Sequence, residues 1–233
     1  MATQYQTTQS TPIAFTAAVR LQQSFVASAE KRTLLWLAER TPRWINSDHL
    51  TLLGFAAQLL AGVSYALARW NRYALLLVIF FLALNWLGDS LDGTLARVRN
   101  CQRPRYGFYV DHIVDTFAAL FLMGGLAFSG YVHPAVAFGL LVAFLMLSIE
   151  AYLTTYALGQ FQLSYWKFGP TEIRLLLALG NLALLRNVNV NIFGMKSLLF
   201  DVGGAVAIVG MMLMLVVSAI RHTRALYVAE RIQ

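Results

Sequence analysis

Apolar residues form long runs along most of this chain, and short polar segments separate them. An α-helix needs about 20 mostly apolar residues to cross the roughly 30 Å hydrocarbon core of a lipid bilayer. Six stretches come near the required length and predict membrane-spanning helices: residues 50–68, 73–87 with a polar continuation to about 98, 108–128, 134–158, 171–185 and 198–220. The fifth of these stretches is short and carries two charged residues, Glu172 and Arg174.

The N-terminal part of the chain has a different pattern. Residues 1–29 are rich in Gln, Thr and Ser, and we expect a mobile tail there. Residues 30–45 interleave leucines and tryptophans with basic residues, which favours a juxtamembrane amphipathic helix in the plane of the membrane surface; an ordinary connector is the alternative. Residues 46–233 then form one domain. The predicted fold is an all-α integral membrane protein with six transmembrane helices and an N-terminal amphipathic interfacial helix.

Local signals mark two of the helix starts. Ser47 and Asp48 precede the first apolar run, and their side chains can accept hydrogen bonds from the free N–H groups of a helix N-terminus. Pro170 precedes the fifth run, and proline is favoured in the first turn of a helix. We therefore expect Ser47 and Asp48 to cap the first helix and the fifth to begin at Pro170.

The composition supports a membrane protein. Hydrophobic residues make up 58% of the 233 residues and charged residues only 12%, whereas a soluble domain has about 25% charged residues. This excludes a water-soluble monomer, and the single cysteine, Cys101, excludes a disulfide scaffold or a multi-cysteine metal site. In so apolar a chain the net charge of +7 indicates cytoplasmic loops and membrane lipid as a partner, and not nucleic acid.

The basic residues also predict the orientation in the membrane. Six spans place both termini on one side, and cytoplasmic loops are enriched in Lys and Arg. If the side that holds the termini is cytoplasmic, it carries 14 of the 18 basic residues. We therefore expect cytoplasmic termini, in the inner membrane if the chain is bacterial. The other side keeps Arg69, Arg72, Arg186 and Lys196.

Four of the six aspartates fall within the 27 residues from 89 to 115. Asp89 and Asp92 are three residues apart, so they share one face of a helix. Asp111 and Asp115 are four apart and share a face of the next helix. Ionisable groups within membrane helices are costly and by default suggest a functional site. If the two helices face each other, the four carboxylates converge on a small volume.

Four carboxylates in a small volume repel one another unless protons or cations bind them. A set of oxygen ligands without His or Cys favours hard ions, Mg²⁺ or Mn²⁺, over zinc. Two such ions suit phosphoryl chemistry because both the attacking and the leaving oxygen need stabilising. The alternative is that the aspartates are helix-end residues paired with arginines of the following loop, which are Arg97, Arg99, Arg103 and Arg105.

Small and basic residues share the face of these aspartates. Gly93 and Ala96 lack bulk, so a ligand or another helix can approach the backbone, and Arg97 supplies a cation for a phosphate. Gly107 lies on the face of Asp111 and Asp115 in the next helix. At about 100° per residue, the arc that holds Asp89 and Asp92 also holds Asn85, Gly93, Ala96 and Arg97.

Together these residues spell a known pattern, Asp89-x2-Asp92-Gly93-x2-Ala96-Arg97-x9-Gly107-x3-Asp111-x3-Asp115. It resembles the complete signature of the CDP-alcohol phosphotransferase family, also called the CDP-alcohol phosphatidyltransferases, with all eight positions in order. The six-helix layout extends the resemblance from about residue 43 to 224. The segment INSDHLTLLG is similar to the family's entry into its first helix, with Ser47 and Asp48 in place of the usual Pro-Asn.

The resemblance implies an integral membrane transferase, typically homodimeric, whose site opens to the cytoplasmic leaflet. In such a reaction an alcohol attacks the phosphorus that bears the transferred group, and CMP leaves. Asp115 would be the general base or a metal ligand. By the resemblance, the ligands of two Mg²⁺ or Mn²⁺ ions are Asp89, Asp92, Asp111 and Asp115, and the residues around the cytidine diphosphate are Asp92, Gly93, Ala96, Arg97 and Gly107.

Two versions of the reaction exist in the family. In the version that the short six-helix chain favours, CDP-diacylglycerol gives its phosphatidyl group to a polar alcohol. In the other, CDP-choline or CDP-ethanolamine gives a head group to diacylglycerol. Two features are similar to the second version: His112, an alternative general base, forms an Asp-His pair in the signature, and GPTEIR begins the fifth helix. Glu172 and Arg174 of that segment are candidate acceptor-binding residues, or else an ion pair at a helix end.

Proteins of other classes explain less of the pattern. A divalent-cation transporter would use the four aspartates as a permeation site, but it gives no role to Gly93, Ala96 and Arg97, and the chain has no evident inverted repeat. A structural membrane protein leaves the four carboxylates unexplained. We therefore expect a phospholipid-synthesising CDP-alcohol phosphotransferase.

Overall fold

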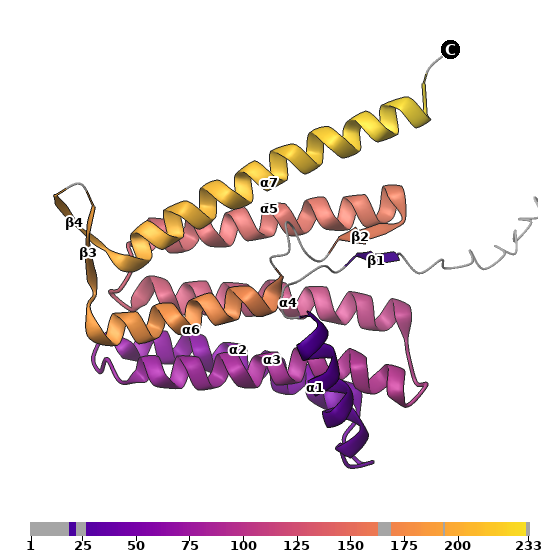
Figure 1. The fold of residues 1–233 in the computed structure, drawn as a ribbon, viewed down its shortest axis with the longest axis horizontal. Coiled ribbons are helices and arrows are strands. Elements are labelled where there is room, and N and C mark those ends of the chain that lie inside the picture. Colours follow the sequence, from indigo (N-terminus) through magenta and orange to yellow (C-terminus); the bar gives the residue numbers. More distant parts are fainter. Residues whose placement is uncertain (1–18, 22–26, 163–168, 193, 232–233) are drawn as a thin grey trace, which may run out of the picture.

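The computed structural model describes residues 19–21, 27–162, 169–192 and 194–231. Helices form most of this part of the chain, and two short two-stranded sheets accompany them (Figure 1). β1 (Val19–Leu21) pairs in parallel with β2 (Gln160–Gln162), and β3 (Asn189–Ile192) pairs antiparallel with β4 (Met195–Leu198). The helices are α1 (Ala27–Arg40), α2 (Ser47–Ala68), α3 (Ala74–Val98), α4 (Pro104–Phe128), α5 (Pro134–Leu158), α6 (Pro170–Arg186) and α7 (Leu199–Ala229).

Each of the six apolar runs forms a helix, in the order α2 to α7. The polar continuation of the second run belongs to one uninterrupted helix, α3, which carries the first two signature aspartates. Five of the helices, α2, α3, α4, α5 and α7, are long and apolar enough to cross a membrane. α6 has 17 residues and is about 26 Å long at about 1.5 Å per residue, so it is not among these five.

The N-terminal segment differs from the sequence prediction in its boundaries. The helix predicted over residues 30–45 begins earlier, at Ala27, and ends at Arg40. Val19–Leu21, predicted as part of a mobile tail, form strand β1, while residues 1–18 and 22–26 lie outside the described residues. α1 runs across the bundle and not along it (Figure 1). It packs on α3 through the buried residues Leu34 and Ala38, because these project from one face of α1.

The start of α2 corrects the predicted cap. Asn46, and not Ser47 or Asp48, caps the helix: its side-chain oxygen accepts a hydrogen bond from the backbone N–H of His49 at 3.0 Å. Asp48 pairs instead with Arg103, next to the start of α4. Pro170 is the first residue of α6, as predicted. The sequence shows three adjacent capping residue types here, and tertiary contacts decide which of them caps the helix.

α2 is the centre of the helix packing that positions the site. It packs against both α3 and α4, whereas α3 and α4 make few contacts with each other in the described residues. Glycines allow the backbones to approach closely: a Cβ atom on Gly88 of α3 would lie 2.5 Å from the backbone nitrogen of Gly54, and one on Gly125 of α4 would overlap the backbone of Gly62. α2 thus holds α3 and α4 on two of its sides.

The remaining helices surround this core. α6 packs against α3, α5 packs against α4, and α7 contacts the rest of the bundle mainly through α5 (Figure 1). In the described residues, α5 and α7 are joined by a polar cluster: the ring Nδ1 of His222 lies 2.6 Å from Oε1 of the buried Glu150, which also accepts from the hydroxyl of Thr154 at 3.0 Å. These contacts account for the intramembrane Glu150.

Candidate active site

The four signature carboxylates lie in one region of the bundle. Asp89 and Asp92 project from the second half of α3, and Asp111 and Asp115 from the first half of α4. Asp89, Asp92 and Asp111 are all close enough to Asp115 to interact with it electrostatically. The side chains are partly buried, which strengthens these interactions relative to water. Bound protons or neighbouring cations are therefore needed to offset the repulsion.

Asp92 is oriented by the start of α2. Its Oδ2 accepts a hydrogen bond from the hydroxyl of Thr51 at 2.6 Å, and its Oδ1 accepts one from the backbone N–H of Gly93. The hydroxyl of Ser47 donates to the backbone carbonyl of Asp92 at 3.0 Å. Thr51 therefore orients this carboxylate, and Ser47 holds the backbone that carries it.

Asp89 is paired with a cation from α6. A guanidinium nitrogen of Arg174 lies 2.5 Å from Oδ2 of Asp89, and Nε of Arg174 donates to the side-chain oxygen of Asn85 at 2.8 Å. Asn85 is buried, and its NH₂ group donates to the backbone carbonyl of Gly54 at 3.0 Å. Arg174 is thus held at two points, as the planar geometry of a guanidinium allows.

The chemistry of the donor set fits a hard divalent ion, because the four signature aspartates supply carboxylate oxygens. In the described residues, however, no three side chains of His, Cys, Asp or Glu are grouped closely enough to hold a metal ion. α3 and α4 each pack mainly on α2, and Arg174 provides a positive charge at Asp89.

The glycines of the signature leave open space beside the carboxylates. A Cβ atom added to Gly107 would meet no other atom within 4 Å, and one added to Gly93 would meet only a guanidinium nitrogen of Arg97, at 3.5 Å. Arg97 is exposed and donates to the hydroxyl of Thr94 at 3.0 Å. Ala96 is partly buried on the same turn. A ligand can therefore approach the backbone next to a guanidinium.

His112 faces α5. Its Nδ1 donates to the backbone carbonyl of Phe108 at 2.6 Å, because a carbonyl can only accept. Its ring stacks on that of Phe108, with ring centroids 4.1 Å apart, and meets the ring of Tyr152 edge-on at 4.9 Å. The nearest oxygen of Asp111 lies 3.8 Å from Nδ1. These contacts fix the ring between α4 and α5.

The two candidate acceptor residues have different surroundings. Glu172 is buried, and its Oε2 accepts from the backbone N–H of Gly169, which completes the cap of α6. Arg174 forms its ion pair with Asp89 of α3 and not with Glu172. Two of the loop arginines bind groups other than the signature aspartates: Arg103 pairs with Asp48, and Arg99 donates to the backbone carbonyl of Thr41 at 2.8 Å.

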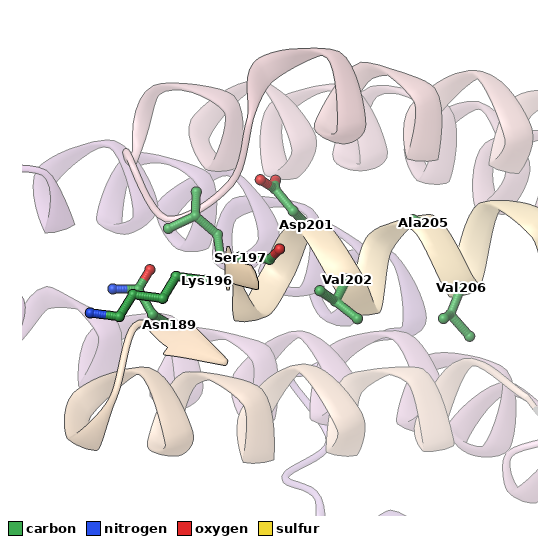
Figure 2. Close-up of a pocket in the computed structure, with 8 residues that line it drawn as sticks. Asn189, Lys196, Ser197, Asp201, Val202, Ala205 and Val206 are labelled. Atoms are coloured by element: carbon green, nitrogen blue, oxygen red, sulfur yellow. The ribbon is translucent and has the colours of Figure 1, made fainter. Parts of the chain in front are cut away.

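A cavity of about 600 Å³ lies elsewhere, beside the β3–β4 hairpin and the start of α7 (Figure 2). The hairpin follows the C-terminal end of α6, whereas Arg174 lies in the first turns of that helix. The cavity is therefore far from the carboxylates, and none of the predicted site residues lines it. Its lining residues are Asn189, Lys196, Ser197, Leu198, Asp201, Val202, Ala205 and Val206.

Sequence reasoning missed several residues of the site. Thr51 bonds to Asp92, and Tyr152 packs on His112, but both are distant in sequence from the residues they contact. The sequence predicts that Asn85 shares a helix face with the aspartates, but it does not predict the hydrogen bond between Asn85 and Arg174. One feature of the sequence could have indicated Thr51: it belongs to the segment INSDHLTLLG, which is similar to the family's entry into its first helix.

The comparison with known families agrees with the signature. The profile of the CDP-alcohol phosphatidyltransferase family matches residues 44–222, which is most of the chain. The chain therefore belongs to the CDP-alcohol phosphatidyltransferase family. This is a family of transferases for phosphate-containing groups, it is generally dependent on divalent metal ions, and it acts in phospholipid biosynthesis. Membership and the five apolar helices fit an integral membrane protein. No curated protein matches the chain in a sequence comparison.

Proposed function

We propose that this protein transfers the phosphatidyl group of CDP-diacylglycerol to the hydroxyl of a polar alcohol, with release of CMP. The observation that carries the proposal is the arrangement of the signature: three carboxylates interact with the fourth, Asp115, and open space lies over Gly107 and over Gly93, which is beside Arg97. A cation transporter has no use for this guanidinium and the space beside it. A phosphoryl transferase needs both, because the diphosphate must approach the carboxylates.

In this proposal the site holds two divalent ions, Mg²⁺ or Mn²⁺, and their ligands are Asp89, Asp92, Asp111 and Asp115. The bound ions would offset the charge of the diphosphate and of the departing CMP. Arg97 binds a phosphate oxygen, and Gly93, Ala96 and Gly107 let the nucleotide approach the two helices. Thr51 keeps Asp92 in a fixed orientation, which limits the reorganisation needed when the substrate binds.

Asp115 is the general base that takes the proton of the attacking hydroxyl. The alternative base is His112. Its Nδ1 donates a hydrogen bond to the backbone carbonyl of Phe108, and its ring lies between α4 and α5. Asp115 instead lies among the other signature carboxylates. A carboxylate in that position can accept the proton as the bond to phosphorus forms.

The second version of the reaction, in which a CDP-aminoalcohol reacts with diacylglycerol, is favoured by one observation. The GPTEIR segment belongs to the site, because Arg174 contacts Asp89. In both versions we propose that the acceptor binds near Arg174 and Glu172 at the start of α6. The identity of the acceptor is therefore the point that the experiment below must decide.

The orientation in the membrane is also part of the proposal. We assign α6 as a sixth span, because it packs along α3 and contributes Leu184 and Asn181 to the buried core. Six spans place both termini on the cytoplasmic side with the site. α1 lies in the membrane surface, where its exposed Trp36 and the nearby Trp44 contact lipid. Two copies associate as a homodimer, as is typical of the family.

The test uses purified protein in lipid nanodiscs with Mg²⁺. One arm supplies CDP-diacylglycerol with inositol, serine, glycerol phosphate or inositol phosphate, and the other supplies CDP-choline or CDP-ethanolamine with diacylglycerol. CMP release in the first arm supports the proposal, and release only in the second supports the aminoalcohol version. If neither arm releases CMP and liposomes that contain the protein conduct Mg²⁺, the proposed transferase activity is wrong and the protein is a cation transporter.

A further inference from the structure

Glu30 of α1 is a second point at which α3 and α6 are joined. Its Oε1 accepts hydrogen bonds from the indole N–H of Trp86 at 2.7 Å and from the hydroxyl of Thr171 at 2.8 Å. The hydroxyl of Ser90 also points to this oxygen, at 3.4 Å. Trp86 and Ser90 belong to α3, and Thr171 belongs to the first turn of α6. One carboxylate oxygen therefore connects three helices.

The contacts of Glu30 flank the ion pair of the active site. Trp86 and Ser90 are the sequence neighbours of Asn85 and Asp89, the two residues that Arg174 binds. Thr171 precedes Arg174 by three residues, which is nearly one helical turn. A shift of the first turn of α6 relative to α3 would therefore stretch both sets of contacts together.

Glu30 itself is held in place by packing of its helix. One turn further along α1, Leu34 is buried against α3, and Ala38 follows on the same face. Their partners include Leu91, which lies between Asp89 and Asp92 on α3, and Leu95, which follows them by about one helical turn. α1 is therefore fixed to α3, and Thr171 is the contact through which Glu30 acts on α6.

We propose that Glu30 is a positioning residue for the transfer reaction: it holds the first turn of α6 against α3, so that Arg174 stays on Asp89 and Asn85. This role lies outside the eight signature positions and before residue 44, where the match to the family begins. It makes α1 a part of the active-site architecture in addition to an element of the membrane surface. Because its readout is turnover, the inference rests on the proposed function.

The experiment is a double-mutant cycle between Glu30 and Arg174. Glu30→Ala, Arg174→Gln and the double variant are compared with wild type by single-turnover CMP release at excess enzyme. If Glu30 acts through Arg174, Glu30→Ala slows the wild type about tenfold but changes the rate of the Arg174→Gln variant less than about twofold. If Glu30 merely supports the fold, the two losses multiply, and the proposal is wrong.

Matched variants separate positioning from general damage. Glu39→Ala removes an exposed carboxylate of the same helix and is expected to keep the wild-type rate. Glu30→Gln keeps a carbonyl oxygen for Trp86 and Thr171, and we expect it to recover most of the rate lost in Glu30→Ala. If the Glu30→Ala variant does not fold, the Thr171→Val variant takes its place in the same cycle. Thr171→Val removes the hydrogen bond between Glu30 and α6 and keeps the hydrogen bond between Glu30 and Trp86.

The outcomes distinguish the two proposals. A wild-type protein that releases no CMP contradicts the proposed function. An active wild type in which Glu30→Ala equals Glu39→Ala contradicts the positioning role and leaves the function intact. Non-additive losses with recovery by Glu30→Gln support both.

Discussion

Arg174 at the start of α6 is paired with Asp89, the first residue of the signature on α3, with 2.5 Å between the guanidinium nitrogen and the carboxylate oxygen. The two side chains are 16% and 25% exposed, so water screens their interaction only weakly. The pair joins a residue outside the signature to one inside it. It also offsets part of the negative charge that the four aspartates bring together.

Arg174→Gln is therefore expected to reduce turnover by about 100-fold, because it removes the cation that stabilises Asp89 and one anchor of α6. Breaking a buried pair by removing one partner typically costs about 3–5 kcal/mol, so the apparent melting temperature should also fall. Arg174→Lys should recover part of the loss through its charge. Arg186→Ala, an exposed arginine at the other end of α6, is the control and should behave as wild type. Wild-type turnover in Arg174→Gln would exclude a role for the pair.

Thr51→Val is expected to slow turnover by about tenfold with little change in stability. The substitution removes the hydroxyl that donates to Asp92 at 2.6 Å and keeps the shape of the side chain. Binding of Mn²⁺, followed by electron paramagnetic resonance, should weaken in parallel, because Asp92 is no longer oriented. A Thr51→Ser variant keeps the hydroxyl and should retain both properties. Unchanged Mn²⁺ binding in Thr51→Val would contradict the role of Thr51 in positioning this carboxylate.

Gly125→Ala should destabilise the protein, whereas Gly124→Ala should not. A methyl group on Gly125 would overlap the backbone of Gly62 in α2, and one on Gly124 would meet no atom within 4 Å. Overpacking of this kind costs about 1–3 kcal/mol. Thermal unfolding in detergent, monitored by the fraction of protein that stays monodisperse, compares the two neighbours directly. Equal stability of the two variants would mean that α2 and α4 are not in close contact.

His222→Ala should loosen α7 from α5, because Glu150 loses its contact at 2.6 Å and keeps its burial. Leaving a buried polar group without its partner costs about 1–3 kcal/mol. The double variant Glu150→Leu, His222→Leu should be more stable than His222→Ala, since no buried carboxylate is then left without its histidine partner. Limited proteolysis after α7 and thermal unfolding measure the effect, and Arg221→Ala serves as control. A fully stable His222→Ala protein would refute the contact.

Most of the helices were predictable from sequence because each coincides with an apolar run, and membrane helices satisfy their backbone hydrogen bonds internally. The signature was also predictable, since its residues are local in sequence and share helix faces. The start of α1 at Ala27 and the β3–β4 hairpin were not predicted. Short strands in polar connections carry no pattern as strong as an apolar run of about 20 residues.

The partners of the signature residues could not be read from the sequence. Nothing local indicates that Thr51 lies on Asp92, that Arg174 lies on Asp89, or that Glu30 meets Thr171. These contacts depend on which helices become neighbours, and α2, not direct contact, places α3 and α4 relative to each other. Among the described residues, the four carboxylates likewise do not form a closed metal-binding group.

The most direct test of the central claim is CMP release from CDP-diacylglycerol by the purified protein in nanodiscs, with the acceptor that the panel identifies. We expect steady release with Mg²⁺ or Mn²⁺, loss of release with excess EDTA, and recovery when the metal is restored. Asp92→Ala should abolish release while the protein still inserts into the membrane, and Asp201→Asn, outside the signature, should keep it. Release that persists in Asp92→Ala, or in EDTA, would contradict a transferase centred on the signature carboxylates.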